Sequence, residues 1–191
     1  FEDRDNFLDR LDVTSKWHIL LIQEAGSWAT GQIEILGRNH CFVGAISAGM
    51  QRTSGVFIHN SLRRNVINHA IKEDHVGVTL RFSFGLCHAI SARLPHRGIC
   101  NTLFDESLAN LDHIFSLLMI NVVSDNVFLG IDANVEIGTT NPWETEFLGP
   151  FAKGIRDNRS QLLAHFISET GLMLLNTYVD LGPSFTGWEL A

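Results

Sequence analysis

The sequence has few cysteines and no long apolar run. The three cysteines are Cys41, Cys87 and Cys100. An odd number without a Cys-x-x-Cys pair argues against a disulfide framework and against a structural zinc site. No apolar stretch approaches the roughly 18 residues that a membrane-spanning helix requires, and the charged residues 1–5 contain no signal-peptide core. We therefore expect an intracellular protein with no membrane partner, and both nucleus and cytoplasm are compatible with the sequence.

Basic residues are also in the minority. The formal net charge is −7, whereas proteins that grip nucleic acid through a broad electrostatic surface are usually basic. The charge therefore disfavours such a surface, but it leaves room for metal ions and for a local basic patch. The nine histidines form no His-x-His or His-x-x-x-His pair, so we expect them on the surface or in the core rather than at a metal.

The length and composition are those of an ordinary globular protein. The chain has 191 residues, of which 45% are apolar and 18% charged. We find no repeat, low-complexity segment or linker, so we predict a single domain over residues 1–191 and expect it to be monomeric. Because the chain does not begin with methionine, we expect a fragment or a processed product.

The first half of the sequence predicts mostly strands. Residues 17–22 form a short continuous apolar run, which is typical of a strand buried on both faces. The residues before it, 7–11, suggest the end of an amphipathic helix. Between residues 33 and 92, short apolar stretches alternate with polar or glycine-containing turns. They predict a meander of mostly antiparallel strands over residues 41–46, 55–58, 76–84 and 86–90.

The second half predicts helices and strands in alternation. Residues 102–122 carry apolar side chains at steps of three and four, which predicts an amphipathic helix. Its buried face would comprise Phe104, Leu108, Leu111, Phe115, Leu118 and Val122. Residues 127–131 predict a buried strand, residues 172–175 predict another, and between them a helix runs from a cap at Asp157 or Asn158 to a stop at Gly171. That helix would bury Leu162, Leu163, Phe166 and Ile167. The order indicates a mixed α/β fold.

Two of the predicted strands stop abruptly at acidic residues. Residues 17–22 lead into Gln23 and Glu24, and residues 127–131 lead into Asp132, Ala133 and Asn134. Ligand sites gather at the carboxyl ends of strands in open α/β sheets, so neighbouring strands would bring Glu24 and Asp132 to one pocket. Magnesium prefers carboxylate oxygens, and one or two suffice when substrate phosphate completes its shell. Asp132 would then orient or deprotonate a water, and Asn134 would hydrogen-bond the phosphate or that water.

The same residues have an ordinary structural interpretation. An acid after a strand is often a solvated loop residue, and Asp-Ala-Asn is favourable turn sequence. From spacing alone, both interpretations stay open. A shared metal requires the Glu24 and Asp132 carboxylates to face one cleft within roughly 8 Å, a gap that a metal and its water can span.

Several ordered segments resemble one known family. Residues 20–24 (LLIQE) look like its metal-binding glutamate motif, and residues 130–134 (GIDAN) look like its Gly-Asp-x-Asn motif with one residue inserted. Residues 54–58 (SGVFI) resemble its Gly-Val strand, and Arg93-Leu-Pro95 occupies the place of its Tyr-x-Pro. The family is the endonuclease/exonuclease/phosphatase superfamily, which includes apurinic/apyrimidinic endonucleases. Residues 158–163, 176–177 and 184–188 look most like the endonuclease domains of non-LTR retrotransposons.

The resemblance implies a fold, a reaction and roles for particular residues. The fold would be a four-layer α/β sandwich, with two mixed β-sheets flanked by helices. The reaction would be cleavage of phosphodiester bonds in DNA, or in another phosphate ester, by water with Mg²⁺ or alternatively Mn²⁺. Glu24 would bind the metal, and Asp132 and Asn134 would be catalytic. The residues expected to bind substrate are Arg93, His96 and Asn158.

The sequence also departs from the family pattern. The family's tyrosine is Arg93 here, which can bind phosphate in a bidentate manner but cannot act as a phenol. The family's first-strand asparagine would lie upstream of Phe1, and its last Asp-His pair would lie beyond Trp188. We therefore expect a domain incomplete at both ends and active only when extended. Two alternatives stay open, namely a phosphatase of inositol lipids or nucleotides and a catalytically inactive relative retained for binding or decaying.

Overall fold

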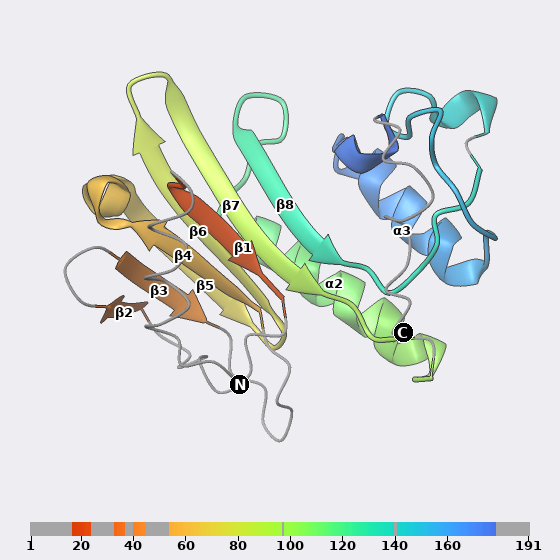
Figure 1. Cartoon of the computed structure of the whole chain (residues 1–191), viewed down its shortest axis with the longest axis horizontal. Coiled ribbons are helices and arrows are strands. Elements are labelled where there is room, and N and C mark those ends of the chain that lie inside the picture. The colour runs from red at the N-terminus through yellow and green to blue at the C-terminus, as the bar shows by residue number, and fades with distance from the viewer. Residues whose placement is uncertain are drawn as a thin grey trace. The chain divides into compact units, whose positions relative to one another are not determined.

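The computed structural model describes residues 17–23, 33–36, 40–44, 54–96, 98–139 and 141–178 (Figure 1). The chain divides into two compact units. The first comprises residues 1–94 and 109–133, and the second comprises residues 95–108 and 134–191. The prediction of one domain over residues 1–191 stays a prediction. The predicted helical turns at residues 7–11 lie outside the described residues.

The first unit contains an antiparallel sheet, here called sheet A. Its strands are β1 (Ile19–Ile22), β2 (Ile33–Leu36), β3 (His40–Gly44) and β4 (Gly55–His59), in the order β1-β4-β3-β2. Each pair of neighbours is antiparallel. Strands β1, β3 and β4 confirm strands at the places predicted over residues 17–22, 41–46 and 55–58, although residues 45 and 46 lie outside the described part of the chain. The expectation that 17–22 is buried on both faces is wrong, because β1 is the end strand of the described sheet and its residues are only half-buried. The described part of this sheet contains no parallel pair, so the expectation of two mixed sheets holds only for the second sheet.

The second sheet of this unit, sheet B, is mixed. After the 3-10 helix η2 (Asn60–Asn65) come β5 (Val66–Lys72), β6 (His75–Phe82), β7 (Gly85–Arg93) and β8 (Asn126–Asp132), in that spatial order. The first three form an antiparallel meander, and β8 pairs parallel to β7. The predicted strands over 76–84, 86–90 and 127–131 correspond to β6, β7 and β8. Because β8 ends the sheet, Phe128 is 57% exposed, so the expectation of a strand buried on both faces is wrong.

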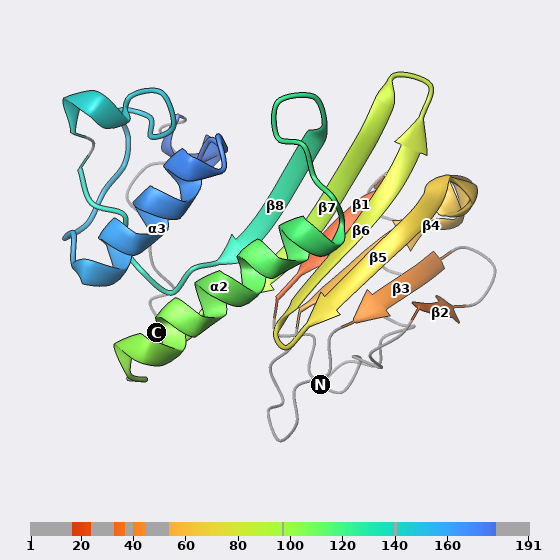
Figure 2. The same ribbon diagram turned by 180° about the vertical axis from the view of Figure 1, so that it is seen from behind.

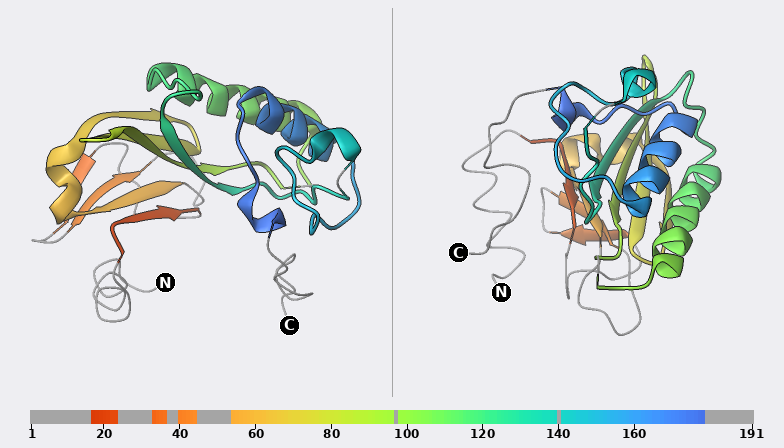
Figure 3. Two further views of the ribbon diagram at one scale, coloured as in Figure 1. Left: turned by 90° about the horizontal axis from the view of Figure 1, so that it is seen from above. Right: turned by 90° about the vertical axis from the view of Figure 1, so that its right-hand side faces the viewer.

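Apolar side chains from both sheets form the core of the first unit. Alternate residues of a strand point to one face, and those of β3, β4, β6 and β7 meet between the sheets, which Figure 3 shows as two layers. This cluster, the inter-sheet core, consists of Cys41, Val43, Val56, Ile58, Val76, Val78, Leu80 and Ala89. Burial of such side chains contributes on the order of 1.5–3 kcal/mol each.

Helix α2 spans Asn101–Leu117, and its residues from 109 onward belong to the first unit. This part of the helix covers the outer face of sheet B (Figure 2). A Cβ at Gly77 on β6 would lie 2.6 Å from Leu118 Cδ1 and 3.0 Å from Ile114 Cγ2, so a glycine permits this close approach. The predicted buried face is confirmed up to Leu118. Val122 is 39% exposed, because the helix ends at Leu117 and the chain turns with a φ of 53° at Met119.

The second unit contains η3 (Pro142–Glu144), α3 (Asn158–Glu169) and η4 (Leu175–Thr177). The Asp157 side chain caps α3 by accepting from Ser160 N, and Gly171 follows the helix with a φ of 63°, as the sequence predicts. Leu163, Phe166 and Ile167 are buried, whereas Leu162 is 36% exposed, contrary to expectation. The strand predicted over 172–175 is also wrong, since it is reduced to a single bridge between Leu148 and Leu174.

The predicted fold class is confirmed as an α/β sandwich of two β-sheets flanked by helices. No helix among the described residues is both long enough and apolar enough to cross a membrane.

Candidate functional site

A glutamine side chain joins the two sheets at the carboxyl end of β1. Gln23 Nε2 donates to Ser91 Oγ on β7 at 3.1 Å and to the carbonyl oxygen of Gly130 on β8 at 3.0 Å. The Ser91 hydroxyl in turn donates to the carbonyl of Ile22 at 2.7 Å. These three hydrogen bonds, here called the seam, hold together the carboxyl-terminal portions of β1, β7 and β8. All of these residues belong to the first unit.

Glycine is needed on β8 at this seam. A Cβ at Gly130 would lie 2.9 Å from Cβ of Leu21 and 3.3 Å from Gln23 Nε2. Real Cβ atoms essentially never approach a neighbouring Cβ so closely, so any larger residue would push β1 and β8 apart. The glycine of the GIDAN segment therefore has a packing role two residues before Asp132.

Arg93 and Asp132 lie at the ends of neighbouring parallel strands. They are register partners of β7 and β8, and Arg93 Nε is 4.0 Å from Asp132 Oδ2. The Leu94 amide donates to the Asp132 carbonyl at 2.8 Å, which continues the strand pairing past the side chains. Arg93 is only 4% exposed, whereas the Asp132 side chain is 39% exposed. The arginine is thus a buried neighbour of a carboxylate that faces solvent, and its predicted contact with substrate stays a prediction.

Asn134 begins the second unit and sits in a turn. Its φ of 52° is in the left-handed region, which asparagine tolerates better than most residues. The backbone therefore leaves the strand direction of β8 within two residues of Asp132. The predicted catalytic role of Asn134 stays a prediction.

Within the second unit, one buried arginine organises the segment that carries His96. Arg159 is 4% exposed, and its guanidinium donates to the carbonyl oxygens of Pro95, His96 and Ile99 and to the side chain of Asn101. The same guanidinium lies 5.1 Å from the centre of the Phe104 ring. One side chain thus fixes residues 95–101 against the start of α3.

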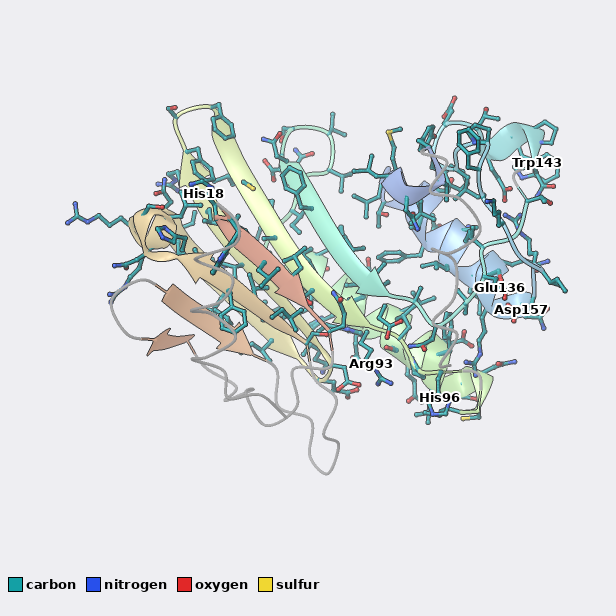
Figure 4. The ribbon with its side chains drawn as sticks, viewed as in Figure 1. His18, Arg93, His96, Glu136, Trp143 and Asp157 are labelled. Carbon is teal, nitrogen blue, oxygen red and sulfur yellow. The ribbon has the colours of Figure 1, made fainter. Side chains whose placement is uncertain are left out.

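The two other predicted substrate-binding residues flank this network. His96 is exposed, and its Nδ1 accepts from Gly98 N at 3.1 Å. Asn158 is exposed at the first position of α3, directly before Arg159. Arg159 therefore joins their two segments, although neither contact with substrate is tested. Figure 4 labels His96 together with Asp157, the cap of α3.

A buried ion pair supports the loop before α3. Arg156 Nη1 donates to Glu144 Oε1, and the Asn141 amide donates to Glu144 Oε2 at 2.8 Å. Burial would raise the pKa of the Glu144 carboxyl, but the hydrogen bonds from Arg156 and Asn141 outweigh it and lower that pKa. The carboxylate is therefore held ionised as a structural group of the second unit.

The proposed metal ligand Glu24 lies outside the described residues. Among the residues that are described, no three or more His, Cys, Asp or Glu side chains gather into a metal-binding group. Asp132 nevertheless presents a partly exposed carboxylate, the donor type that Mg²⁺ prefers, and this ion needs only one or two from a protein. The donor chemistry of Asp132 fits a magnesium ion, and the predicted role of Glu24 as metal ligand stays a prediction.

Sequence reasoning missed Gln23 and Arg159. Both side chains donate to main-chain carbonyl oxygens. Every residue has such a carbonyl, so the sequence does not show which residue will be the acceptor. The available signals were weak. A glutamine directly after an apolar strand and an arginine in the first turn of a capped helix are both common on protein surfaces.

The arrangement is that of an α/β sandwich with polar side chains at the carboxyl ends of its strands. One solved structure with this fold is the endonuclease domain of TRAS1, a telomere-specific non-LTR retrotransposon, with a TM-score of 0.53 and 13% sequence identity. The similarity covers 85% of this chain and 63% of that one. No protein-family model matches the chain, and neither does any curated protein sequence. At this identity the similarity establishes the fold alone.

Proposed function

We propose that this chain is a nuclease domain that hydrolyses phosphodiester bonds in nucleic acid. The observation that carries the proposal is the Arg93–Asp132 pair at the ends of the parallel strands β7 and β8, in a fold similar to that of an endonuclease domain. In such α/β sheets the carboxyl ends of the strands are the usual place for a ligand. We further propose descent from the endonuclease/exonuclease/phosphatase superfamily, in its retroelement-type branch, with DNA as the substrate.

Asp132 is the proposed catalytic base. Its side chain is 39% exposed, so a water can reach its carboxylate and be oriented for attack on phosphorus. Asn134, in the turn that follows, is proposed to hydrogen-bond a phosphate oxygen or the water. Arg93 balances the charge of Asp132 from its buried position, and the part of its guanidinium nearest to solvent is proposed to contact phosphate.

Glu24 would hold the ion, Mg²⁺ or Mn²⁺, beside the catalytic Asp132. When bound there, it would offset the negative charge on the phosphoryl oxygens. Substrate contacts are likewise proposed for His96 and Asn158, whose segments Arg159 joins within the second unit.

A cleavage assay tests the proposal. Nicking of supercoiled plasmid, cleavage of an abasic duplex and phosphate release from inositol phosphate are measured with Mg²⁺ or Mn²⁺. Both the printed chain and a version extended at both ends are assayed. We expect nicking that Asp132→Asn reduces by a factor on the order of 10²–10⁴, the range for loss of a general base. Asp112→Asn, which changes an exposed acid of α2, serves as the matched control and should cleave like the wild type.

Three outcomes would contradict the proposal. If Asp132→Asn cleaved as fast as the wild type, Asp132 would not be the catalytic base on which the proposal depends. Phosphate release from inositol phosphate without any cut in DNA would indicate a phosphatase. A folded, extended protein that acts on none of the substrates would indicate an inactive relative.

A further inference from the structure

A polar pocket lies on η2, away from the candidate site. It has a volume of about 640 Å³, and the described residues that line it are Asn60, Ser61, Arg63 and Arg64. Strand β4 separates the two places. Its first residue pairs with Ile22 at the seam, and η2 begins after its last residue. In Figure 4, His18, which precedes β1, lies at the end of the strands remote from Arg93.

The local sequence explains why both arginines face solvent. The His59 ring caps η2 by accepting from the Ser61 amide at 3.2 Å and contacts the Ser61 hydroxyl at 2.8 Å. Leu62 packs against the inter-sheet core and anchors the turn. Arg63 and Arg64 follow this anchor and are exposed. Within the described part of the chain, neither of them forms an ion pair.

An exposed aromatic ring stands on the same end of the first unit. Asn65, the last residue of η2, donates to the carbonyl oxygen of Arg81 near the end of β6 at 2.6 Å. Phe82 packs against the inter-sheet core, as Leu62 does. Phe84, in the turn after β6, stacks on Phe82 with ring centres 5.0 Å apart and an interplanar angle of 4°. It is 72% exposed, so one face of a rigidly supported ring is open to solvent.

We infer that η2 and the β6–β7 turn form a binding surface for single-stranded nucleic acid, distinct from the candidate catalytic site. Unpaired arginines beside a polar pocket suit backbone phosphates, and a supported aromatic ring suits an unstacked base. This combination favours a single strand over a duplex, whose bases are already stacked on one another. It also favours nucleic acid over an isolated phosphate, which offers the ring nothing to stack on. The net charge of −7 therefore coexists with a local basic surface.

Binding can be measured without any cleavage. Fluorescence anisotropy of a labelled 12-nucleotide oligothymidine is followed in EDTA over a series of salt concentrations. We expect Arg63→Gln and Arg64→Gln each to weaken binding several-fold and to lower the salt slope by about one, as for the loss of a phosphate contact. Phe84→Ser should weaken binding at least about fivefold with an unchanged salt slope, because stacking does not release counterions. Lys153→Gln, which removes an exposed charge in the second unit, is the control and should bind like the wild type.

The test separates this inference from the proposed nuclease function. The binding assay is run in EDTA, so its outcome does not depend on whether the chain cleaves anything. Equal weakening by Lys153→Gln would reduce the effect to overall charge and overturn the inference. Wild-type affinity in both arginine variants would overturn it too. Complete competition by inorganic phosphate at low concentration would indicate a small-anion site instead, and a preference for a blunt duplex would contradict the stacking role of Phe84.

Discussion

Arg93 and Asp132 face each other across the parallel strands β7 and β8, with Nε and Oδ2 4.0 Å apart, yet one side chain is buried and the other is partly exposed. The pair is therefore asymmetric. Water can solvate the carboxylate if the guanidinium is removed, whereas the guanidinium has little access to solvent if the carboxylate is removed. The two partners should respond differently to substitution.

We predict that Arg93→Lys keeps the fold but lowers cleavage. Lysine retains the charge and loses the planar fork that arginine uses toward oxygen pairs. The free energy of unfolding should fall by no more than about 1–2 kcal/mol, because lysine keeps a positive charge near Asp132 and that carboxylate is also partly solvated. Urea denaturation and plasmid nicking on the same samples check this. A loss of cleavage accompanied by global unfolding would show that Arg93 acts only as a structural residue.

Gly130→Ala should destabilise the first unit by about 1–3 kcal/mol, the usual cost of overpacking. The added methyl would meet Leu21 Cβ, which is fixed to the backbone and cannot rotate away. The comparison variant is Gly77→Ala, where the closest atom is the flexible Leu118 Cδ1, so its loss should be smaller. Equal losses in thermal or urea denaturation would contradict the distinction between the two contacts.

Arg159→Ala should loosen residues 95–101. Without the guanidinium, three main-chain carbonyls lose their donor, and we expect a cost of about 2–4 kcal/mol. Hydrogen exchange should rise in that segment before the rest of the second unit opens. Arg159→Lys should recover only part of the protection, since one ammonium cannot reach every acceptor. Arg64→Gln, an exposed arginine, should leave exchange unchanged, and a uniform rise throughout the chain would argue against a local role.

The Asp125 carboxyl gives the segment just before β8 a dependence on pH. His88 Nδ1 contacts Thr79 Oγ1 at 3.0 Å, and its Nε2 contacts Asp125 Oδ2 at 3.2 Å. A hydrogen bond from the Asn121 amide lowers the pKa of the Asp125 carboxyl. Burial opposes this shift, and the contacts with His88 and Ser124 add to the lowering, so the pKa of Asp125 stays below its ordinary value. A lowered folded-state pKa contributes stability above the ordinary value of 3.8 and loses it as pH falls through the folded-state value.

We therefore predict that Asp125→Asn costs about 1–2 kcal/mol at neutral pH and progressively less below about pH 4. Urea unfolding of both proteins at pH 7 and pH 3 measures the difference. Asp112→Asn, in which an exposed acid is neutralised, is the control for net charge. A difference that stays constant or grows toward pH 3 would contradict the assignment to the Asp125 carboxylate.

Sequence patterns predicted those parts of the structure in which neighbouring residues carry the signal. The face of α2 was correct as far as Leu118 because helical spacing is local, and it failed at Val122 because a left-handed turn at Met119 ended the helix. Strand β5 was missed, since Asn68 and Lys72 interrupt its apolar pattern and only its pairing with β6 reveals it. The solvent exposure of Phe128 depends on how many strands follow β8 in the sheet, and the sequence around Phe128 does not indicate that number.

The candidate site shows the same division. The acid after β8 and the cap of α3 could be predicted, because each is a residue type at a chain position that favours it. The register of β7 and β8 makes Arg93 the partner of Asp132. The two residues are 39 positions apart (93 to 132), and no rule of sequence spacing predicts that register. The roles of Gln23 and Arg159 depend on carbonyls 107 and up to 64 residues away in the sequence.

The seam also sets an order of events during synthesis. Strands β5, β6 and β7 are consecutive and joined by short turns, so their meander can form as soon as it leaves the ribosome. Gln23 must wait for Gly130, 107 residues later, before its amide finds both acceptors. The edge that carries Asp132 can therefore be completed only after β8 has been synthesised, and a ligand for that edge can bind only from that point on.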